Sequence, residues 1–223
     1  MAKTAIIAGA SGLIGKFCLS YLLMDKNYSK VIVISRTAFP IKDPKLENIV
    51  CDFDQLAQHS SKLNADDVYC CLGTTIAVAG SQENFKKVDL HYPLELARIT
   101  KQQGAKQFMI VSAMGANSKS SIFYNRVKGE MQEQLKNIGF NTVHIFQPSL
   151  LTGLRKEFRM GERIAQVMMK IFRPLMFGPM KQYKPIEGMV VAYAMHQKAL
   201  LEHNGYYIHQ SSDIQSIFDR RVL

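Results

Sequence analysis

The sequence predicts an α/β protein built on a doubly wound parallel sheet with helices on both faces. Two observations predict it. First, the apolar run Lys3-Thr-Ala-Ile-Ile-Ala8 passes directly into three glycines, Gly9, Gly12 and Gly15, and then into a helical pattern. Second, short apolar runs alternate with amphipathic stretches from there to Pro148. Such alternation is typical of parallel sheets, in which each crossover helix returns the chain to the same edge.

Each expected element follows from its local pattern. The expected strands are short apolar runs that are rich in β-branched or aromatic residues. They cover residues 3–8, 31–35, 47–51, 67–72, 107–112 and 142–147. The expected helices repeat apolar residues every three or four positions. They cover residues 12–24, 53–59, 82–103 and 121–138.

The three glycines have the spacing and position of a phosphate-binding turn. Gly9 allows a tight turn out of the strand, Gly12 lets the backbone approach a pyrophosphate, and Gly15 lets the helix pack against the sheet. Free N–H groups at the start of the helix face the phosphates. The G-x-x-G-x-x-G spacing differs by one residue from the simplest fingerprint, and an ordinary loop is the alternative. The place between a strand and a helix favours a Rossmann-like dinucleotide-binding fold.

The pattern changes after Pro148. The expected elements there are a helix at 161–171, a Pro- and Gly-marked stretch at 174–188, a helix at 187–202, a strand from Tyr206 to His209 and a closing helix from about Ser212. A length of 223 residues suits one domain. We therefore expect a single NAD(P)-binding domain over 1–223, in which 149–205 supply most of a small C-terminal lobe on the substrate side.

Charge and hydropathy limit the functional class. The chain has 28 Lys and Arg against 18 Asp and Glu, a formal net charge of +10. Basic residues are dispersed, with no run of five or six like charges, so a nucleic-acid partner is not favoured. The sequence shows neither an apolar run of 18 residues nor a signal-peptide pattern. We expect a cytoplasmic protein without a membrane span.

The four cysteines do not suggest a metal site. Cys18, Cys51, Cys70 and Cys71 lack zinc spacing. Adjacent Cys70 and Cys71 point to opposite faces of a strand and cannot easily share a metal. We expect reduced thiols in the core and no metal.

Two segments after the glycine turn bear on the cofactor. Strand 31–35 is followed by Arg36, where an acidic residue would select the ribose 2′-hydroxyl of NAD. Arg36 offers a fork of donors to a 2′-phosphate, so NADP(H) is favoured over NAD(H), although a surface arginine after a strand is common. Asp52 and Phe53 follow the third strand and are candidates to hold the adenine. Alternatively, Asp52 caps the short helix after it.

A second chemical signal lies on the helix at 121–138. Tyr124 and Lys128 are four residues apart and share a helix face, where the ammonium favours the phenolate and lowers the tyrosine pKa. Ser112, at the end of the fifth strand, can orient a substrate oxygen. Such a pair also occurs by chance on amphipathic helices. Its combination with Ser112 and the glycine turn indicates acid–base chemistry on a carbonyl or alcohol.

These motifs resemble the short-chain dehydrogenase/reductase superfamily in its extended or atypical branch, which includes epimerases and dehydratases. Further blocks resemble the Tat-interacting-protein-like oxidoreductases and their bacterial relatives, and the similarity covers almost the whole chain. The blocks are Cys71-Leu-Gly-Thr-Thr75, Ala79-Gly-Ser81, Phe85-Lys-Lys-Val-Asp89, Ser112-Ala-Met-Gly-Ala-Asn117, Lys128-Gly-Glu130 and Arg155-Lys-Glu157-Phe-Arg159-Met-Gly-Glu162. The last two are the most specific.

The resemblance implies roles for further residues. It implies that the phosphate turn holds NADP(H) through Ser11, Gly12, Leu13 and Ile14, and that Arg36 binds the ribose phosphate. It places Leu72 and Gly73 near the nicotinamide, and Leu151 and Arg159 where they close over the cofactor. It also places Tyr124 and Lys128 in both catalysis and cofactor contact.

Two departures from the superfamily pattern keep a second function open. Many relatives have consecutive serines where this chain has Ser112 followed by Ala113, and Asp89 stands where a water-holding Asn is frequent. A carboxylate there adds negative charge near a phenol that must ionise. The main expectation is an NAD(P)-dependent oxidoreductase with an unidentified carbonyl or alcohol substrate. The alternative is a redox-sensing regulator that binds NADP(H) and a protein partner without turnover. A protein partner or a homodimer is open for either function.

Overall fold

The computed structural model describes residues 2–152, 184–201 and 203–222. Within them, seven parallel strands form one sheet in the order β3-β2-β1-β4-β5-β6-β9. The strands are β1 (Lys3–Ala8), β2 (Tyr28–Ser35), β3 (Leu46–Val50), β4 (Asp67–Cys70), β5 (Gln107–Val111), β6 (Thr142–Gln147) and β9 (Gly205–Gln210). The order reverses beside β1, because β2 pairs with one side of it and β4 with the other. The expected doubly wound parallel sheet is confirmed.

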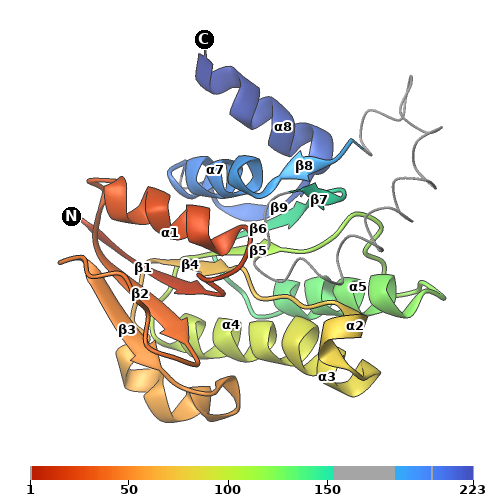
Figure 1. Ribbon diagram of the computed structural model, residues 1–223, viewed down its shortest axis with the longest axis horizontal. Helices are drawn as coiled ribbons and strands as arrows, with labels where there is room; N and C mark the ends of the chain where they lie inside the picture. The colour runs from red at the N-terminus through yellow and green to blue at the C-terminus, as the bar shows by residue number, and fades with distance from the viewer. Residues whose placement is uncertain (1, 153–183, 202, 223) are drawn as a thin grey trace.

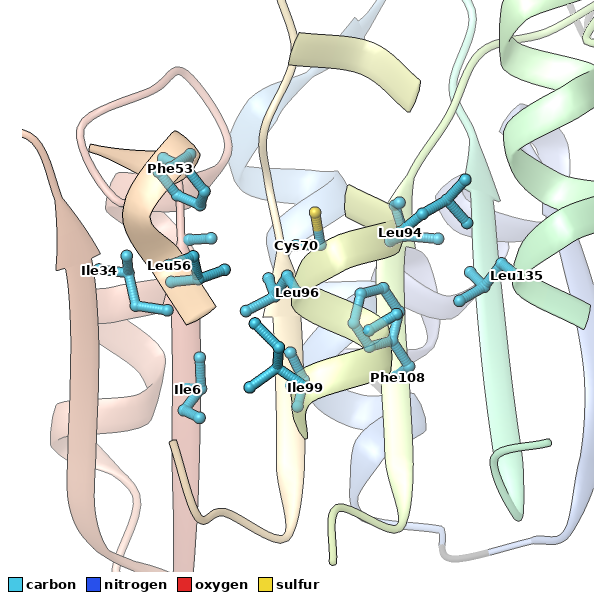
Figure 2. Packing of buried hydrophobic residues seen from close by; sticks show 14 of the residues in the cluster. Ile6, Ile34, Phe53, Leu56, Cys70, Leu94, Leu96, Ile99, Phe108 and Leu135 are labelled. Atoms are coloured by element: carbon cyan, nitrogen blue, oxygen red, sulfur yellow. The ribbon is translucent and has the colours of Figure 1, made fainter. Parts of the chain in front are cut away.

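Helices cover both faces of the sheet (Figure 1). One layer contains the 3₁₀ helix η1 (Phe53–Lys62), α4 (Tyr92–Gln102) and α5 (Phe123–Lys136). The other contains α1 (Gly15–Met24), α7 (Gly188–Ala199) and α8 (Ser211–Asp219), which ends in the short 3₁₀ helix η5 (Arg220–Val222). Alternation along β1 supplies both cores, because Ile6 faces the first layer and Ile7 the second. Figure 2 shows Ile6 in the first core with Leu96 and Phe108.

The long helix expected at 82–103 is broken. The structure has α3 (Gln82–Lys86), a π-helical turn η2 (Lys87–His91) and then α4. Pro93 lies in the first turn of α4. Because proline has no N–H and its ring crowds the turn before it, regular α-helical bonding cannot continue through this point. The wider π turn absorbs the mismatch, and it carries Asp89.

Three short elements were not expected from the sequence. They are α2 (Ile76–Ala79) and the strands β7 (Leu151–Thr152) and β8 (Ile186–Glu187), which pair with each other. The helix expected at 187–202 forms as α7 and packs against α1. The helix expected at 161–171 lies outside the described residues, as does most of the stretch at 174–188. No helix in the described residues is long and apolar enough to span a membrane.

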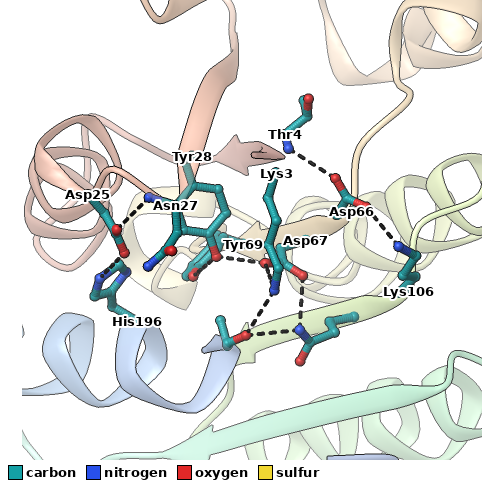
Figure 3. A network of polar contacts seen from close by, with 12 residues as sticks. Lys3, Thr4, Asp25, Asn27, Tyr28, Asp66, Asp67, Tyr69, Lys106 and His196 are labelled. Atoms are coloured by element: carbon teal, nitrogen blue, oxygen red, sulfur yellow. Dashed lines mark hydrogen bonds and ion pairs between the residues drawn. The ribbon is translucent and has the colours of Figure 1, made fainter. Parts of the chain in front are cut away.

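A polar network ties the amino ends of the strands together (Figure 3). Asp67, only 1% exposed, accepts hydrogen bonds from the Tyr28 hydroxyl at 2.6 Å and from Gln107 Nε2 at 3.0 Å. Lys3 Nζ lies 3.3 Å from the same carboxylate. Burial raises the pKa of Asp67, while Tyr28 and Lys3 act to lower it. Lys3, Asp67 and Gln107 are the first residues of their strands. The network therefore lies at the amino ends of the strands, whereas the glycine turn lies at the carboxyl ends, and we assign it a structural role.

The cysteines are free thiols, as expected. Cys70 packs in the core beneath η1, α4 and α5, whereas Cys71 packs on the α1 side. Cys71 Sγ lies 3.8 Å from Cys18 Sγ on α1. Burial raises the pKa of Cys70 to about 12, which disfavours the reactive thiolate.

Candidate active site

The glycine turn lies at the carboxyl end of β1 and is built from close backbone contacts. Gly9 has φ of 82°, and a Cβ there would lie 2.5 Å from the carbonyl oxygen of Cys71. A Cβ on Gly15 would lie 2.1 Å from the Gly9 carbonyl oxygen. Side chains at these positions would therefore push the turn apart. Gly12 is exposed, and a Cβ there would meet only the Gly9 oxygen within 4 Å among the described atoms.

The start of α1 fits a phosphate group. Within the described residues, the N–H groups of Leu13 and Ile14 make no backbone hydrogen bond. None of the described side chains caps α1, and its first turn holds no acidic residue. Ser11 and Lys16 are exposed beside it. Unpaired N–H groups and the positive end of a helix dipole favour an anion, so these residues fit a dinucleotide pyrophosphate.

The three residues expected to bind the adenosine end of the cofactor, Arg36, Asp52 and Phe53, differ in exposure and in their contacts. Arg36 follows β2 at the carboxyl edge, is exposed, and forms no ion pair within the described part of the chain. Asp52 caps η1, because its Oδ1 accepts a hydrogen bond from Asp54 N at 3.0 Å. The Phe53 ring is buried and packs against Tyr92 at a centroid distance of 5.3 Å. The capping alternative for Asp52 is thus what the structure shows, while its contact to adenine stays a prediction.

Lys128 lies in the interior beside Asp89 and Tyr124. Its Nζ is 2.7 Å from Asp89 Oδ1, and the two side chains are 6% and 1% exposed. Burial acts to lower the pKa of Lys128, but Asp89 and Tyr124 raise it above its ordinary value. Lys128 is therefore charged at neutral pH. Tyr124 is half-buried, with its ring 5.5 Å from that of Phe85.

The segment after β4 connects this ion pair with the glycine turn. The backbone nitrogen of Leu72 would lie 3.0 Å from a Cβ on Gly9, so the two turns touch. Gly73 is exposed, and the N–H of Thr74 donates to Asp89 Oδ2 at 2.9 Å. Leu72 and Gly73 therefore lie between the expected pyrophosphate position and Lys128, and their contact with the nicotinamide stays a prediction.

Ser112 directly follows β5 and is held from α5. Gln132 Nε2 donates to Ser112 Oγ at 2.6 Å, and Gln147 Nε2 donates to Gln132 Oε1 at 3.2 Å. Ser112 is 5% exposed. Gln132 is one turn beyond Lys128 on α5, whereas Tyr124 is one turn before it. The structure thus places Lys128 beside Tyr124 and Asp89. Ser112 is hydrogen-bonded to Gln132, one helical turn beyond Lys128 on the side away from Tyr124.

The two residues expected to close over the cofactor are only partly described. Leu151 is half-buried in β7, which pairs with β8, the strand directly before α7 in the sequence. Arg159 lies outside the described residues. Its role stays a prediction.

Sequence reasoning missed the partners of the site residues. Gln132 could have been found, because Tyr124, Lys128 and Gln132 repeat every four residues and share one face of α5. The direct pairing of Asp89 with Lys128 had no local signal, since 39 positions separate them. Thr74 contributes only its backbone N–H, which leaves no trace in residue type.

Comparisons with known proteins show the family of this chain. Residues 5–135 match the family described as NAD dependent epimerase/dehydratase family. Protein HTATIP2 of Rattus norvegicus is 36% identical over 168 residues, covering 74% of this chain and 69% of that protein. Protein FMP52, mitochondrial, of Lodderomyces elongisporus is 32% identical over 199 residues, covering 84% of this chain and 83% of that protein.

Solved structures share the fold at low sequence identity. MoeE5 in complex with UDP-glucose and NAD has a TM-score of 0.70 and 14% identity, over 96% of this chain and 80% of that chain. A UDP-N-acetylglucosamine 4-epimerase from Methanobrevibacter ruminantium has a TM-score of 0.70 and 17% identity, over 94% of this chain and 76% of that chain. The glycine turn, the parallel sheet and the matched residues together show that this chain belongs to the NAD dependent epimerase/dehydratase family and has its NAD(P)-binding Rossmann-like fold.

Proposed function

We propose that the protein is an NADP(H)-dependent oxidoreductase that acts on a carbonyl or alcohol, with Tyr124 as the acid–base group. The observation that carries this proposal is the buried, charged Lys128 beside Tyr124, reached from the glycine turn through Leu72 and Gly73. An ammonium held next to a phenol stabilises the phenolate. A group of this kind exchanges a proton at a substrate oxygen near neutral pH.

Each residue has a distinct part in the proposed reaction. The dinucleotide, when bound, supplies or accepts the hydride. Tyr124 donates a proton to a carbonyl oxygen, or accepts one from an alcohol. Lys128 keeps its positive charge in the interior and stabilises the phenolate form. Ser112 receives a hydrogen bond from Gln132, so its own O–H is left to orient the substrate oxygen.

The preference for NADP(H) rests on Arg36. Its exposed guanidinium follows β2 without an ion pair among the described residues. The 2′-phosphate of NADP carries the negative charge that suits it, and Gly12, Leu13 and Ile14 are assigned to the pyrophosphate. Asp52, Phe53, Leu151 and Arg159 are assigned to the rest of the dinucleotide. We further propose a cytoplasmic location, although the fungal relatives are named mitochondrial.

The test is a panel of carbonyl compounds and sugar nucleotides, followed by NADPH consumption and by product analysis for epimerisation or dehydration. On an active compound, Tyr124→Phe should lower turnover by roughly 10²–10⁴-fold with cofactor affinity nearly unchanged. Lys128→Ala should damage both. Turnover that survives Tyr124→Phe would refute the mechanism, and tight NADPH binding without any turnover would support the regulatory alternative.

A further inference from the structure

Asp89 is a buried carboxylate whose two oxygens face different groups. Oδ2 accepts the N–H of Thr74 at 2.9 Å. Oδ1 lies 2.7 Å from Lys128 Nζ, yet no donor in the described part of the chain makes a well-angled hydrogen bond to it. The Lys128 ammonium compensates the charge of this oxygen, but a carboxylate oxygen has two lone pairs and can accept a further hydrogen bond. Oδ1 is therefore open to a ligand hydroxyl.

The missing side chain of Gly73 leaves space beside that oxygen. A Cβ on Gly73 would lie 3.5 Å from Asp89 Oδ1 and 4.0 Å from Lys128 Nζ, and no other described atom would be within 4 Å of it. Gly73 is exposed. This acceptor and this donor are therefore the polar atoms nearest to a ligand group that packs against Gly73.

The charge of this position selects a neutral ligand group. A phosphate that approached the Lys128 ammonium here would also meet the Asp89 carboxylate, which repels it. A pair of hydroxyls matches the two groups, because one hydroxyl can donate to the carboxylate while the other accepts from the ammonium. The pyrophosphate position lies next to it, since the backbone of Cys71 and Leu72 touches Gly9. The dinucleotide carries such a diol on the ribose beyond its pyrophosphate.

The family resemblance already implies a cofactor contact for Lys128. We propose that Asp89 is a second binding residue there, with Oδ1 accepting a hydrogen bond from one hydroxyl of the nicotinamide ribose while Lys128 Nζ donates to the other. This inference rests on the proposed function, because it assumes that the protein binds a nicotinamide dinucleotide. It makes Asp89 a cofactor-binding residue, not the holder of a relay water. It also explains why position 73 has no side chain.

Two substitutions probe the pair from different sides. In Asp89→Asn, the amide oxygen keeps the bond from Thr74 N, so the NH₂ group replaces Oδ1 and presents a donor where the diol needs an acceptor. Gly73→Ala adds a methyl group at ordinary contact distance from both partners, so the fold is kept while the space is filled. Asp66→Asn is the matched control. Asp66 is also paired with a lysine, Lys106 at 3.1 Å, but it directly precedes β4 and so lies at the amino ends of the strands, away from the site.

The ligands are NADPH and adenosine 2′,5′-bisphosphate, which lacks the nicotinamide ribose; NADH and 5′-AMP replace them if the protein prefers NADH. Fluorescence or calorimetric titration measures each affinity. Asp89→Asn and Gly73→Ala should each weaken NADPH about 10-fold or more and change the bisphosphate less than about twofold. Asp66→Asn should change neither.

The outcomes separate this inference from the proposed function. Unchanged NADPH affinity in both Asp89→Asn and Gly73→Ala overturns the inference and leaves the oxidoreductase proposal standing. An equal loss for NADPH and the bisphosphate also overturns it, because the substitution then acts on the whole site. If the unaltered protein binds neither dinucleotide, both proposals fail.

Discussion

Acid should destabilise this protein through a buried histidine pair that joins the edge strand β9 to β6. His144 Nδ1 lies 2.9 Å from His209 Nε2, and the two side chains are 3% and 8% exposed. Burial lowers the pKa of His144 to about 3, with His209, Lys198 and His203 acting in the same direction. Burial and Lys198 lower the pKa of His209 to about 4, against the opposing effect of Asp213. Both imidazoles are therefore neutral in the folded state near neutral pH.

The sign and size of the effect follow from proton linkage. In the unfolded chain each histidine binds a proton near its ordinary pKa of 6.5, whereas the folded pair does not until the pH falls far lower. The contribution of the pair to the free energy of unfolding is thus constant above about pH 7 and declines below pH 6.5. At pH 5, 1.5 units below the unfolded pKa, each histidine contributes a loss of about 2 kcal/mol, or about 4 kcal/mol for the pair. That is a large share of the ~5–15 kcal/mol that stabilises a typical domain.

The assay is urea unfolding at about pH 7.5 and pH 5, followed by circular dichroism, on the unaltered protein and on His209→Gln. The variant removes one titrating group, so it should lose about 2 kcal/mol less on acidification. His196, whose pKa burial also lowers, titrates in both proteins and cancels in the comparison. His91→Gln, at an exposed site, is the control and should lose as much as the unaltered protein. The reasoning is refuted if His209→Gln shows the full acid loss.

The other two predictions concern the site. Arg36→Ala should weaken NADPH binding by about 1.5–3 kcal/mol and barely affect NADH, because a charge-assisted contact to the 2′-phosphate is lost; titration of both dinucleotides measures this, and equal affinities in the unaltered protein would contradict it. Ser112→Ala should lower the free energy of unfolding by about 1–3 kcal/mol in urea denaturation, because buried Gln132 Nε2 loses its acceptor. A variant of undiminished stability would show that this hydrogen bond contributes nothing net.

The parts of the fold that local sterics decide could be predicted from the sequence. The glycine turn is one case, because Gly9 and Gly15 each face backbone atoms that would overlap a Cβ. The opposite faces of Cys70 and Cys71 are another, because strand geometry alone requires them. Pro93 also signals the break of the helix expected at 82–103, but helical periodicity continues on both sides of the π turn and favours one long helix.

The partners within the site could be predicted less well. Asp89 had been identified as a departure near the phenol, but its pairing with Lys128 depends on how η2 packs against α5. A single sequence contains no measure of that packing. Ser112 had been placed at a strand end next to the site, and this is its position. Its hydrogen bond to Gln132 depends on the depth at which α5 lies on the sheet.

The pairing of α1 with α7 has a consequence for how the chain is made. The first core can begin to assemble early, since η1 and α4 follow soon after the strands that they cover. The second core, beneath α1, α7 and α8, needs residues that the ribosome synthesises far apart in time, because Cys18 on α1 contacts Met195 on α7, 177 positions later. Until α7 has left the ribosome, Leu19 and Leu22 have no cover from that helix. Nascent chains halted before residue 188 should therefore be prone to aggregation and chaperone-bound, and should become soluble once α7 is supplied.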